Sequence, residues 1–200
     1  LMVPGGPMLT GRWKREEIGS GTDVFRFWDM CRSGRMTEEE FVEIESCLSR
    51  SRGHCMVMGT ASTMTSLAEA IGMTLPGCAS IPAADSRRLT IAQESGRRIV
   101  GMVEEELRPS KIMTARALEN AIRVDMAIGG STNAVVHLCA LAGRLELPLE
   151  LDRFDEISRD TPMLANVKPS GEFLMEDFFY AGGVPAVMKE ISELLHLDVL

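Results

Sequence analysis

Apolar residues recur every three or four positions along most of the chain, which is the pattern of amphipathic helices rather than of strands. Phe41, Ile44 and Leu48 form one such stripe. Thr37 precedes it and Glu40 follows three residues later, the pattern of a capping box. These positions predict a helix from about residue 38 to residue 50.

A second helix is predicted from about residue 61 to residue 72. Its apolar positions Met64, Leu67, Ala68 and Ile71 have helical spacing, and a glycine ends the run. Because a glycine-bounded turn comes directly before it, the amino terminus of this helix is expected to face that turn.

A longer helix is predicted between residues 86 and 107. Asp85 or Ser86 can cap its start, and Pro109 stops it because proline cannot continue a helix. Its inner face is expected to consist of Ile91, Ile99, Met102 and Val103.

Two further helices are predicted on either side of Gly129 and Gly130. Thr114 can cap the first, whose buried side should comprise Ala117, Ala121, Val124 and Ile128. Ser131 or Thr132 can restart the second, whose inward side should comprise Ala134, Leu138, Leu141 and Leu145.

The pattern is weaker elsewhere. Residues 1–23 are rich in glycine and predict a loop, residues 163–167 are a candidate strand, and residues 176–180 look helical. Pro185 suits the first turn of a last helix with buried Val187, Ile191 and Leu194. Many helices with few short strands indicate an α or α/β domain, and no repeat or linker divides the chain.

Composition narrows the classes of function. The 200 residues are 45% hydrophobic and 25% charged, as in ordinary soluble globular proteins. The formal charge of −8 argues against nucleic-acid binding, which needs a basic face. No apolar run is long enough to span a bilayer, so no membrane partner is expected.

Five cysteines occur without Cys-x-x-Cys spacing, which does not look like a disulfide framework. Reduced thiols in a cytoplasmic compartment fit this pattern better. Cys47 and Cys139 lie in apolar helical patterns and are predicted to be small core residues. Cys31 and Cys78 are expected in turns.

Residues 53–64, with the sequence Gly-His-Cys-Met-Val-Met-Gly-Thr-Ala-Ser-Thr-Met, carry the strongest chemical signal. Cys55 lies just before a helix, where free backbone N–H groups and the helix dipole stabilise a thiolate. Such a thiolate suits a metal or cluster ligand, or a nucleophile activated by His54 or His137. An inert buried cysteine is the third alternative, and the residues alone do not choose. His137 is otherwise expected to be a hydrogen-bonded core residue.

Two more segments present backbone groups that a ligand could approach. Ser131, Thr132 and Asn133 follow two glycines at a helix start, where free amides suit a carboxylate or phosphate. A tight turn between helices is the alternative there. Gly5 and Gly6 let the backbone come close to a site, and a plain loop is the alternative for them.

Three motifs in order carry a resemblance to a known family. The run 55–77, the Gly-Gly-Pro-Met at residues 5–8 and the Gly-Gly-Ser-Thr-Asn at residues 129–133 resemble the dihydroxy-acid/sugar-acid dehydratase family over nearly the whole chain. That family includes dihydroxy-acid, phosphogluconate and aldonate dehydratases. The sequence after Cys55 is more similar to the sugar-acid members, since the branched-chain enzyme tends to carry Ser-Gly-Met-Phe there.

The resemblance implies an α/β fold in which helices flank a mainly parallel sheet. Residues 1–200 would form part of a single amino-terminal domain, and the chain is expected to be an internal fragment. The first cluster cysteine and a Cys-Asp-Lys motif would lie before Leu1. The catalytic base would follow Leu200, as would a β-barrel-like domain.

The resemblance further implies part of an iron–sulfur hydro-lyase that dehydrates an aldonate to a 2-keto-3-deoxy acid. Cys55 would ligate the cluster, with [2Fe–2S] favoured over [4Fe–4S], and the Mg²⁺ ligands would lie mostly outside this chain. A homo-oligomer, dimer or tetramer, is expected. The alternatives are a dihydroxy-acid dehydratase of branched-chain amino acid synthesis and a non-catalytic fragment without a cluster. Residues expected to line the site are Gly5, Gly6, His54, Met56, Thr60, Ser131, Thr132 and Asn133.

Overall fold

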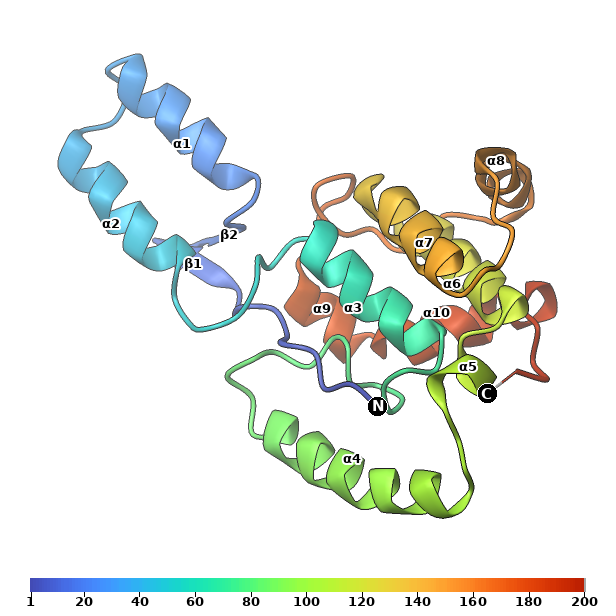
Figure 1. Ribbon diagram of the computed structural model, residues 1–200. Coiled ribbons are helices and arrows are strands. Elements are labelled where there is room, and N and C mark those ends of the chain that lie inside the picture. Colours follow the sequence, from blue (N-terminus) through green and yellow to red (C-terminus); the bar gives the residue numbers. More distant parts are fainter. Residues whose placement is uncertain (200) are drawn as a thin grey trace.

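The computed structural model describes residues 1–199, which are mostly helical (Figure 1). A short hairpin comes first, and helices of 4 to 18 residues follow. In chain order the elements are β1 (Gly11–Trp13), β2 (Glu16–Ile18), α1 (Asp23–Arg32), α2 (Glu38–Leu48), α3 (Thr60–Ala70), α4 (Arg87–Glu104), α5 (Pro109–Ile112), α6 (Ala115–Ile128), α7 (Asn133–Arg144), α8 (Leu151–Asp160), α9 (Met175–Tyr180), α10 (Gly183–Glu190) and the 3₁₀ turn η1 (Ser192–Leu194).

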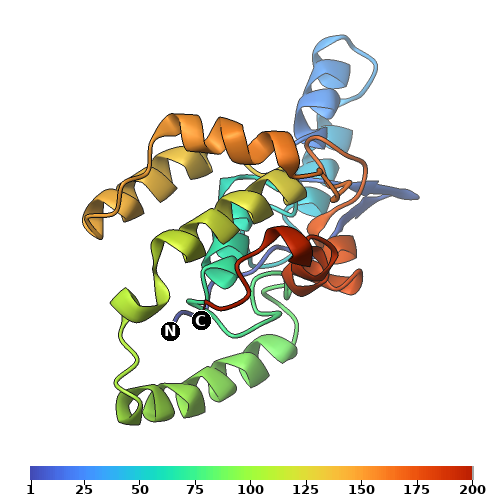
Figure 2. The ribbon, with the colours of Figure 1, turned by 90° about the vertical axis from the view of Figure 1, so that its right-hand side faces the viewer.

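The main core forms around α6, which packs against α3, α7, α8 and α10 (Figures 1 and 2). The predicted stripe of α6 is confirmed, since Ala117, Ala121, Val124 and Ile128 are all fully buried. Small residues on this face let neighbouring helices approach closely. α6 is therefore the element that fixes where α3 and α7 begin relative to each other.

A second, smaller core lies in the part of the molecule made by β1, β2, α1 and α2, which projects to one side in Figure 1. The two strands are antiparallel, with Gly11 opposite Ile18. The Trp13 and Phe27 rings meet edge to face at 5.5 Å, and Ile44 is fully buried beside them. The predicted stripe of α2 packs into this core.

The expected mainly parallel sheet is wrong for the described residues. Their sheet consists of two antiparallel strands, within the segment predicted to be a loop. Residues 163–167 form no strand, and only Val167 makes an isolated bridge, to Phe173. Helices α1 and α8 were not predicted. The expectation of a parallel sheet came from the family resemblance. The helical spacing of the apolar residues predicted the secondary structure of the described residues better.

The predicted helix ends are largely confirmed because their signals are local. Thr37 Oγ1 accepts a hydrogen bond from the Glu40 amide, and the Glu40 carboxylate accepts one from the Thr37 amide, which completes the capping box. Thr114 Oγ1 accepts from the Ala117 amide at the start of α6. Gly129 ends α6 in the left-handed conformation that glycine favours.

α4 differs from its prediction in the direction it faces. Met102 is buried as expected, but Ile99 and Val103 are 42% and 72% exposed. Figures 1 and 2 show α4 along one edge of the molecule. α4 is the longest helix, and within residues 1–199 no helix combines the length and apolarity needed to cross a membrane.

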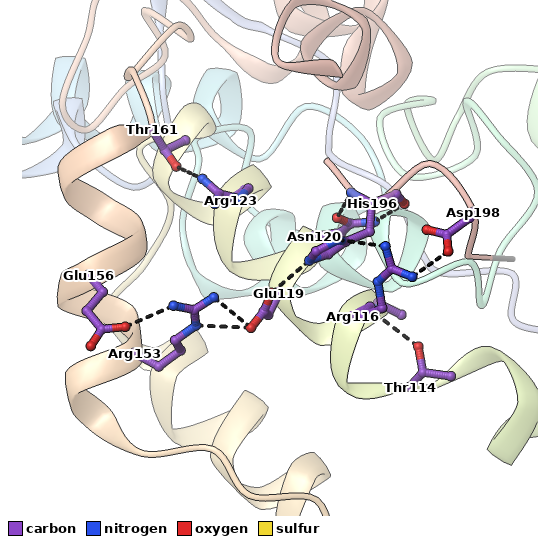
Figure 3. Close-up of polar contacts among 11 residues, drawn as sticks. Thr114, Arg116, Glu119, Asn120, Arg123, Arg153, Glu156, Thr161, His196 and Asp198 are labelled. Atoms are coloured by element: carbon purple, nitrogen blue, oxygen red, sulfur yellow. Dashed lines mark hydrogen bonds and ion pairs between the residues drawn. The ribbon is translucent and has the colours of Figure 1, made fainter. Parts of the chain in front are cut away.

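A polar network ties α6 to α8 and to the segment after η1 (Figure 3). The Arg153 guanidinium donates to Glu119 at 2.8 Å, and the other Glu119 oxygen contacts His196 Nε2 at 2.8 Å. Asn120 is buried and bonds both backbone groups of His196, donating to its carbonyl at 3.0 Å and accepting from its amide at 2.9 Å. This network fixes the last described residues on α6.

Candidate functional site

Cys55 lies in a turn held between the start of the chain and α3. The backbone of His54 pairs with the Gly5–Met8 loop, because Met8 N donates to the His54 carbonyl at 2.8 Å and His54 N donates to the Gly6 carbonyl at 3.0 Å. Gly6 is buried in this contact, whereas Gly5 is exposed. The structure therefore brings together two of the three motifs from the sequence.

The Cys55 side chain is half-buried and has a polar neighbour. Its Sγ lies 2.9 Å from the Ser20 hydroxyl, which can donate to a thiolate. A Cβ added at Gly21 would lie 2.9 Å from this sulfur and 2.7 Å from Val57, so only glycine allows the loop to come this close. Residues 19–21 thus form one wall of the sulfur's surroundings, a contact that the sequence did not reveal.

The loop beside the sulfur is held by an ion pair. Asp23 accepts from the Gly19 amide at 2.7 Å and from Lys168 Nζ at 2.8 Å. Burial opposes ionisation of Asp23, but the hydrogen bonds from Lys168 and Gly19 outweigh it and lower the carboxyl pKa. The Lys168 carbonyl in turn accepts from Met58 N at 2.7 Å. These residues position the loop of Ser20 against the Cys55 turn.

His54 faces the backbone and not the thiol. Its Nδ1 lies 3.1 Å from the Cys55 carbonyl oxygen and 3.3 Å from the Ser62 hydroxyl, while Nε2 is buried without a partner in the described residues. Burial lowers the pKa of His54, and the nearby Arg88 charge lowers it further. A neutral His54 therefore shapes the turn, and no hydrogen bond joins it to the Cys55 sulfur in the described residues.

The Gly-Gly-Ser-Thr-Asn turn packs onto the first turn of α3. Thr60 Oγ1 lies 3.1 Å from the Ser131 hydroxyl and accepts from Asn133 Nδ2 at 2.8 Å. The Ser131 amide donates to Thr63 Oγ1 at 3.0 Å. The third motif therefore adjoins the helix that follows Cys55, and Thr132 is exposed beside it.

Asp125 lies beneath this turn and was not predicted. Its side chain is 5% exposed, and Oδ1 is buried without a hydrogen-bonding partner in the described residues. Burial alone raises the pKa of Asp125 to about 7. A Cβ added at Gly130 would lie 2.0 Å from this oxygen, so the carboxyl occupies the space that a side chain at residue 130 would need.

Three other residues singled out from the sequence differ from their predicted positions. Met56 is fully buried, and its sulfur accepts from the Gly11 amide at 3.4 Å, beneath the site and not on its surface. His137 was expected in the core but is exposed on α7. Cys31 was expected in a turn but lies in α1.

The remaining thiols sit in different surroundings. Cys47 and Cys139 are half-buried against the two cores, close to their prediction. Cys78 is fully buried in the turn predicted for it, and burial raises the pKa of its thiol. Within residues 1–199, no three His, Cys, Asp or Glu side chains gather in a group that could hold a metal ion.

Comparisons with known proteins give the family. The family described as "Dihydroxy-acid/6-phosphogluconate dehydratase N-terminal" matches residues 1–200. The chain is 56% identical to an L-arabinonate dehydratase of Rhizobium leguminosarum bv. trifolii (strain WSM2304) over 202 residues, covering 100% of this chain and 35% of the relative.

Two further relatives bear on the substrate. An L-arabonate dehydratase of Azospirillum brasilense is 52% identical and matches 96% of this chain and 33% of its own length. A dihydroxy-acid dehydratase of Ignicoccus hospitalis is 46% identical and matches 100% of this chain and 36% of its own length. The chain thus spans about a third of the length of these curated relatives.

Proposed function

The chain belongs to the dihydroxy-acid/6-phosphogluconate dehydratase family, and from this premise we propose that it carries the cysteine-bearing part of a hydro-lyase that dehydrates an aldonate to a 2-keto-3-deoxy acid. The observation that carries the proposal is the Cys55 turn. Its sulfur is half-buried, lies 2.9 Å from a hydroxyl and is enclosed by two loops and the approach to α3.

The proposed substrate is a sugar acid related to arabinonate. The relatives named for arabinonate or arabonate are 56% and 52% identical to this chain, whereas the dihydroxy-acid dehydratase is 46% identical. The difference is modest and favours the sugar-acid substrate over the branched-chain one.

The proposed cofactor is an iron–sulfur cluster, with [2Fe–2S] preferred over [4Fe–4S]. Such clusters are held by thiolates whose hydrogen bonds tune them, and Cys55 with the Ser20 hydroxyl fits one ligand position. Cys78 does not fit, because its thiol is fully buried and its pKa is raised by that burial. In this proposal the other thiolates, the base and most Mg²⁺ ligands belong to the rest of a longer polypeptide.

When bound, a cluster with an open coordination position supplies a Lewis acid toward the leaving hydroxyl. The part assigned to this chain's own residues is to bind and orient the sugar acid. Ser131, Thr132 and Asn133 lie at the amino terminus of α7, where the helix dipole and the side-chain hydroxyl and amide groups favour a carboxylate. Thr60 and Ser131 share a hydrogen bond that holds this turn to α3. The neutral His54 and the buried Met56 keep the Cys55 turn in place.

The test is Cys55→Ser in the full-length protein, assayed for turnover of L-arabinonate and for bound iron and sulfide. The variant should lose activity by at least a hundredfold and contain less iron, because a hydroxyl replaces a thiolate poorly at a soft metal site. Cys139→Ser is the matched control, since Cys139 is half-buried against the core, and it should keep both iron and activity.

Three outcomes would contradict all or part of the proposal. Unchanged iron and sulfide in the Cys55 variant would remove this residue from the cluster. Iron-loaded wild-type protein that turns over no aldonate and no dihydroxy acid would favour the non-catalytic alternative. Faster turnover of a branched-chain dihydroxy acid than of L-arabinonate would retain the lyase but replace the substrate.

A further inference from the structure

Ser20 places a hydroxyl directly against the sulfur of Cys55. The Ser20 Oγ lies 2.9 Å from Cys55 Sγ, and within residues 1–199 this is the only hydrogen bond that the Ser20 side chain makes. Either atom can be the donor while Cys55 is a free thiol. A thiolate has no proton to give, so the hydroxyl must donate once Cys55 is ionised or bound to a metal.

The loop that carries Ser20 has a glycine on each side of it, and both glycines leave space for the Cys55 turn. A Cβ added at Gly21 would lie 2.9 Å from Cys55 Sγ. A Cβ added at Gly19 would lie 3.1 Å from the Val57 side chain. Neither glycine adopts a left-handed backbone conformation, so both serve here for their small size. The backbone on either side of Ser20 can therefore come close enough for the hydroxyl to reach the sulfur.

The same loop is held in shape without the hydroxyl. The amides of Thr22 and Asp23 donate to the Gly19 carbonyl at 3.3 Å and 3.0 Å. The Asp23 carboxylate accepts from the Gly19 amide at 2.7 Å and forms an ion pair with Lys168 at 2.8 Å. Because these bonds come from the backbone and from Asp23, removing the Ser20 hydroxyl should leave the loop folded.

We propose that Ser20 is a positioning residue that tunes the proposed cluster through Cys55, by donating a hydrogen bond to its thiolate. Ser20 has this role only if Cys55 ligates an iron–sulfur cluster, as the proposed function assumes. A hydrogen bond withdraws electron density from the ligand sulfur, which stabilises the reduced form and raises the reduction potential. The same withdrawal leaves the metal a stronger Lewis acid toward a hydroxyl group.

Ser62 offers a matched control beside the same turn. Its hydroxyl is buried and donates to the Val57 carbonyl at 2.7 Å, and within residues 1–199 it makes no hydrogen bond to the Cys55 sulfur. Ser62 is 1% exposed, whereas Ser20 is only half-buried. If Ser20 had a purely structural role, Ser62→Ala would therefore be the more disruptive of the two changes in every measurement.

The first experiment titrates the one-electron reduction of the cluster in the full-length protein, followed by electron paramagnetic resonance. At a given applied potential, Ser20→Ala should favour the oxidised form about tenfold more than wild type does, which corresponds to a midpoint potential lower by about 59 mV. Ser62→Ala should keep the wild-type midpoint potential. In urea the order reverses, because Ser62→Ala should unfold at a lower concentration than wild type and Ser20→Ala should not.

The second experiment detects the hydrogen bond itself. Pulsed electron paramagnetic resonance of the reduced cluster in D₂O should resolve a deuteron coupling in wild type and in Ser62→Ala, because the Ser20 hydroxyl proton exchanges with solvent. This coupling should be lost in Ser20→Ala. Neither experiment depends on turnover of a substrate.

Three results would overturn the role of Ser20 while leaving the cluster in place. They are equal midpoint potentials in wild type and Ser20→Ala, an equal shift in Ser62→Ala, and a deuteron coupling that persists in Ser20→Ala. Wild-type protein that contains no iron and sulfide would instead overturn the proposed cofactor, and the role of Ser20 with it.

Discussion

Several side chains near the candidate site are in close contact with neighbouring protein atoms. Asp125 occupies the space beside Gly130, and Gly21 gives room to the sulfur of Cys55. A change at either glycine places a methyl group where another atom already lies. Substitutions of single residues here should therefore act through steric clashes or through the ionisation of a buried group.

Asp125→Asn tests the buried carboxyl. Burial raises its pKa from 3.8 to about 7, so between these values the folded chain holds a proton that the unfolded chain has lost. The protonated carboxyl therefore stabilises the fold fully below about pH 4, and this stabilisation is lost as the pH rises to about 7. The free energy of unfolding falls by about 1.4 kcal/mol per pH unit over this interval, or roughly 4 kcal/mol in total. The asparagine variant should be more stable than wild type at pH 8, by about 1–3 kcal/mol after the cost of burying an amide.

The measurement for Asp125→Asn is urea unfolding from pH 5 to pH 8. The difference between variant and wild type should grow from pH 5 to about pH 7 and then level off. A constant difference would mean that Asp125 does not change its ionisation on folding. Comparison with wild type is necessary because Glu69, whose pKa is also raised by burial, adds its own pH dependence.

Gly130→Ala tests the space beside Asp125. The new Cβ would lie 2.0 Å from Asp125 Oδ1 and 2.9 Å from Thr63, so the turn must shift, at a cost of about 1–3 kcal/mol. Gly143→Ala in α7 is the control, because nothing lies within 4 Å of its added Cβ and alanine favours the helix by about 0.5–1 kcal/mol. Thermal melts should move in opposite directions, and equal melting temperatures would contradict the steric argument.

At the scale of elements, α6 organises the molecule because one helix contacts both the core helices and the last described segment. Its apolar face packs against α3, α7 and α10, and its polar residues Glu119 and Asn120 hold the segment around His196 (Figure 3). The exposed ion pairs in this network contribute little, since solvent screens them. The buried amide of Asn120 should matter more.

Asn120→Ala should release the segment around His196. The change leaves the His196 amide and carbonyl without their buried partner, which costs about 2–4 kcal/mol for two groups at about 1–2 kcal/mol each. Arg116→Ala is the comparison variant, because Arg116 also contacts this segment, through Asp198 and through His196 Nδ1 at 3.2 Å. Its side chain is 52% exposed and that of Asp198 is 63% exposed, so solvent screens their ion pair. Hydrogen exchange in a peptide covering residues 192–199 should accelerate in the first variant only, and similar exchange in both would assign the anchoring to the ion pair.

At the scale of the whole molecule, the described residues gather three turns near one half-buried thiol. The Cys55 turn, the Gly5–Met8 loop and the turn before α7 adjoin α3, and one thiol is exposed enough to bind a ligand there. An iron–sulfur cluster is held by several thiolates, so this arrangement alone does not complete one.

Residues 1–200 expressed alone should therefore show no dehydratase activity on any aldonate. The reason is that the proposal assigns only one cluster thiolate, Cys55, to these residues, and it assigns the base and most Mg²⁺ ligands to other parts of a longer polypeptide. Assay of L-arabinonate turnover together with iron and sulfide content checks this prediction. Measurable turnover with a stable brown chromophore would show that the residues in this chain suffice and that the proposed division of roles is wrong.

The sequence by itself determined those features whose causes lie within a few residues. The capping box of Thr37 and Glu40, the cap at Thr114 and the left-handed Gly129 are each made by groups close together in the chain. The apolar stripe of α6 was also readable, because helical spacing puts its residues on one face whatever they pack against. The Cys55 turn was found from local composition and from the family resemblance.

Only the tertiary structure decided which groups far apart in the chain meet. Ser20 reaches the Cys55 sulfur across 35 residues, and Lys168 reaches Asp23 across 145. α4 has two apolar faces, and periodicity could not say that Met102 turns inward while Val103 turns outward. Asp125 is an ordinary polar residue in the sequence, and its raised pKa exists only because folding buries it without a partner. Local signals specify helices and their ends, whereas burial, pairing and ionisation depend on neighbours that folding supplies.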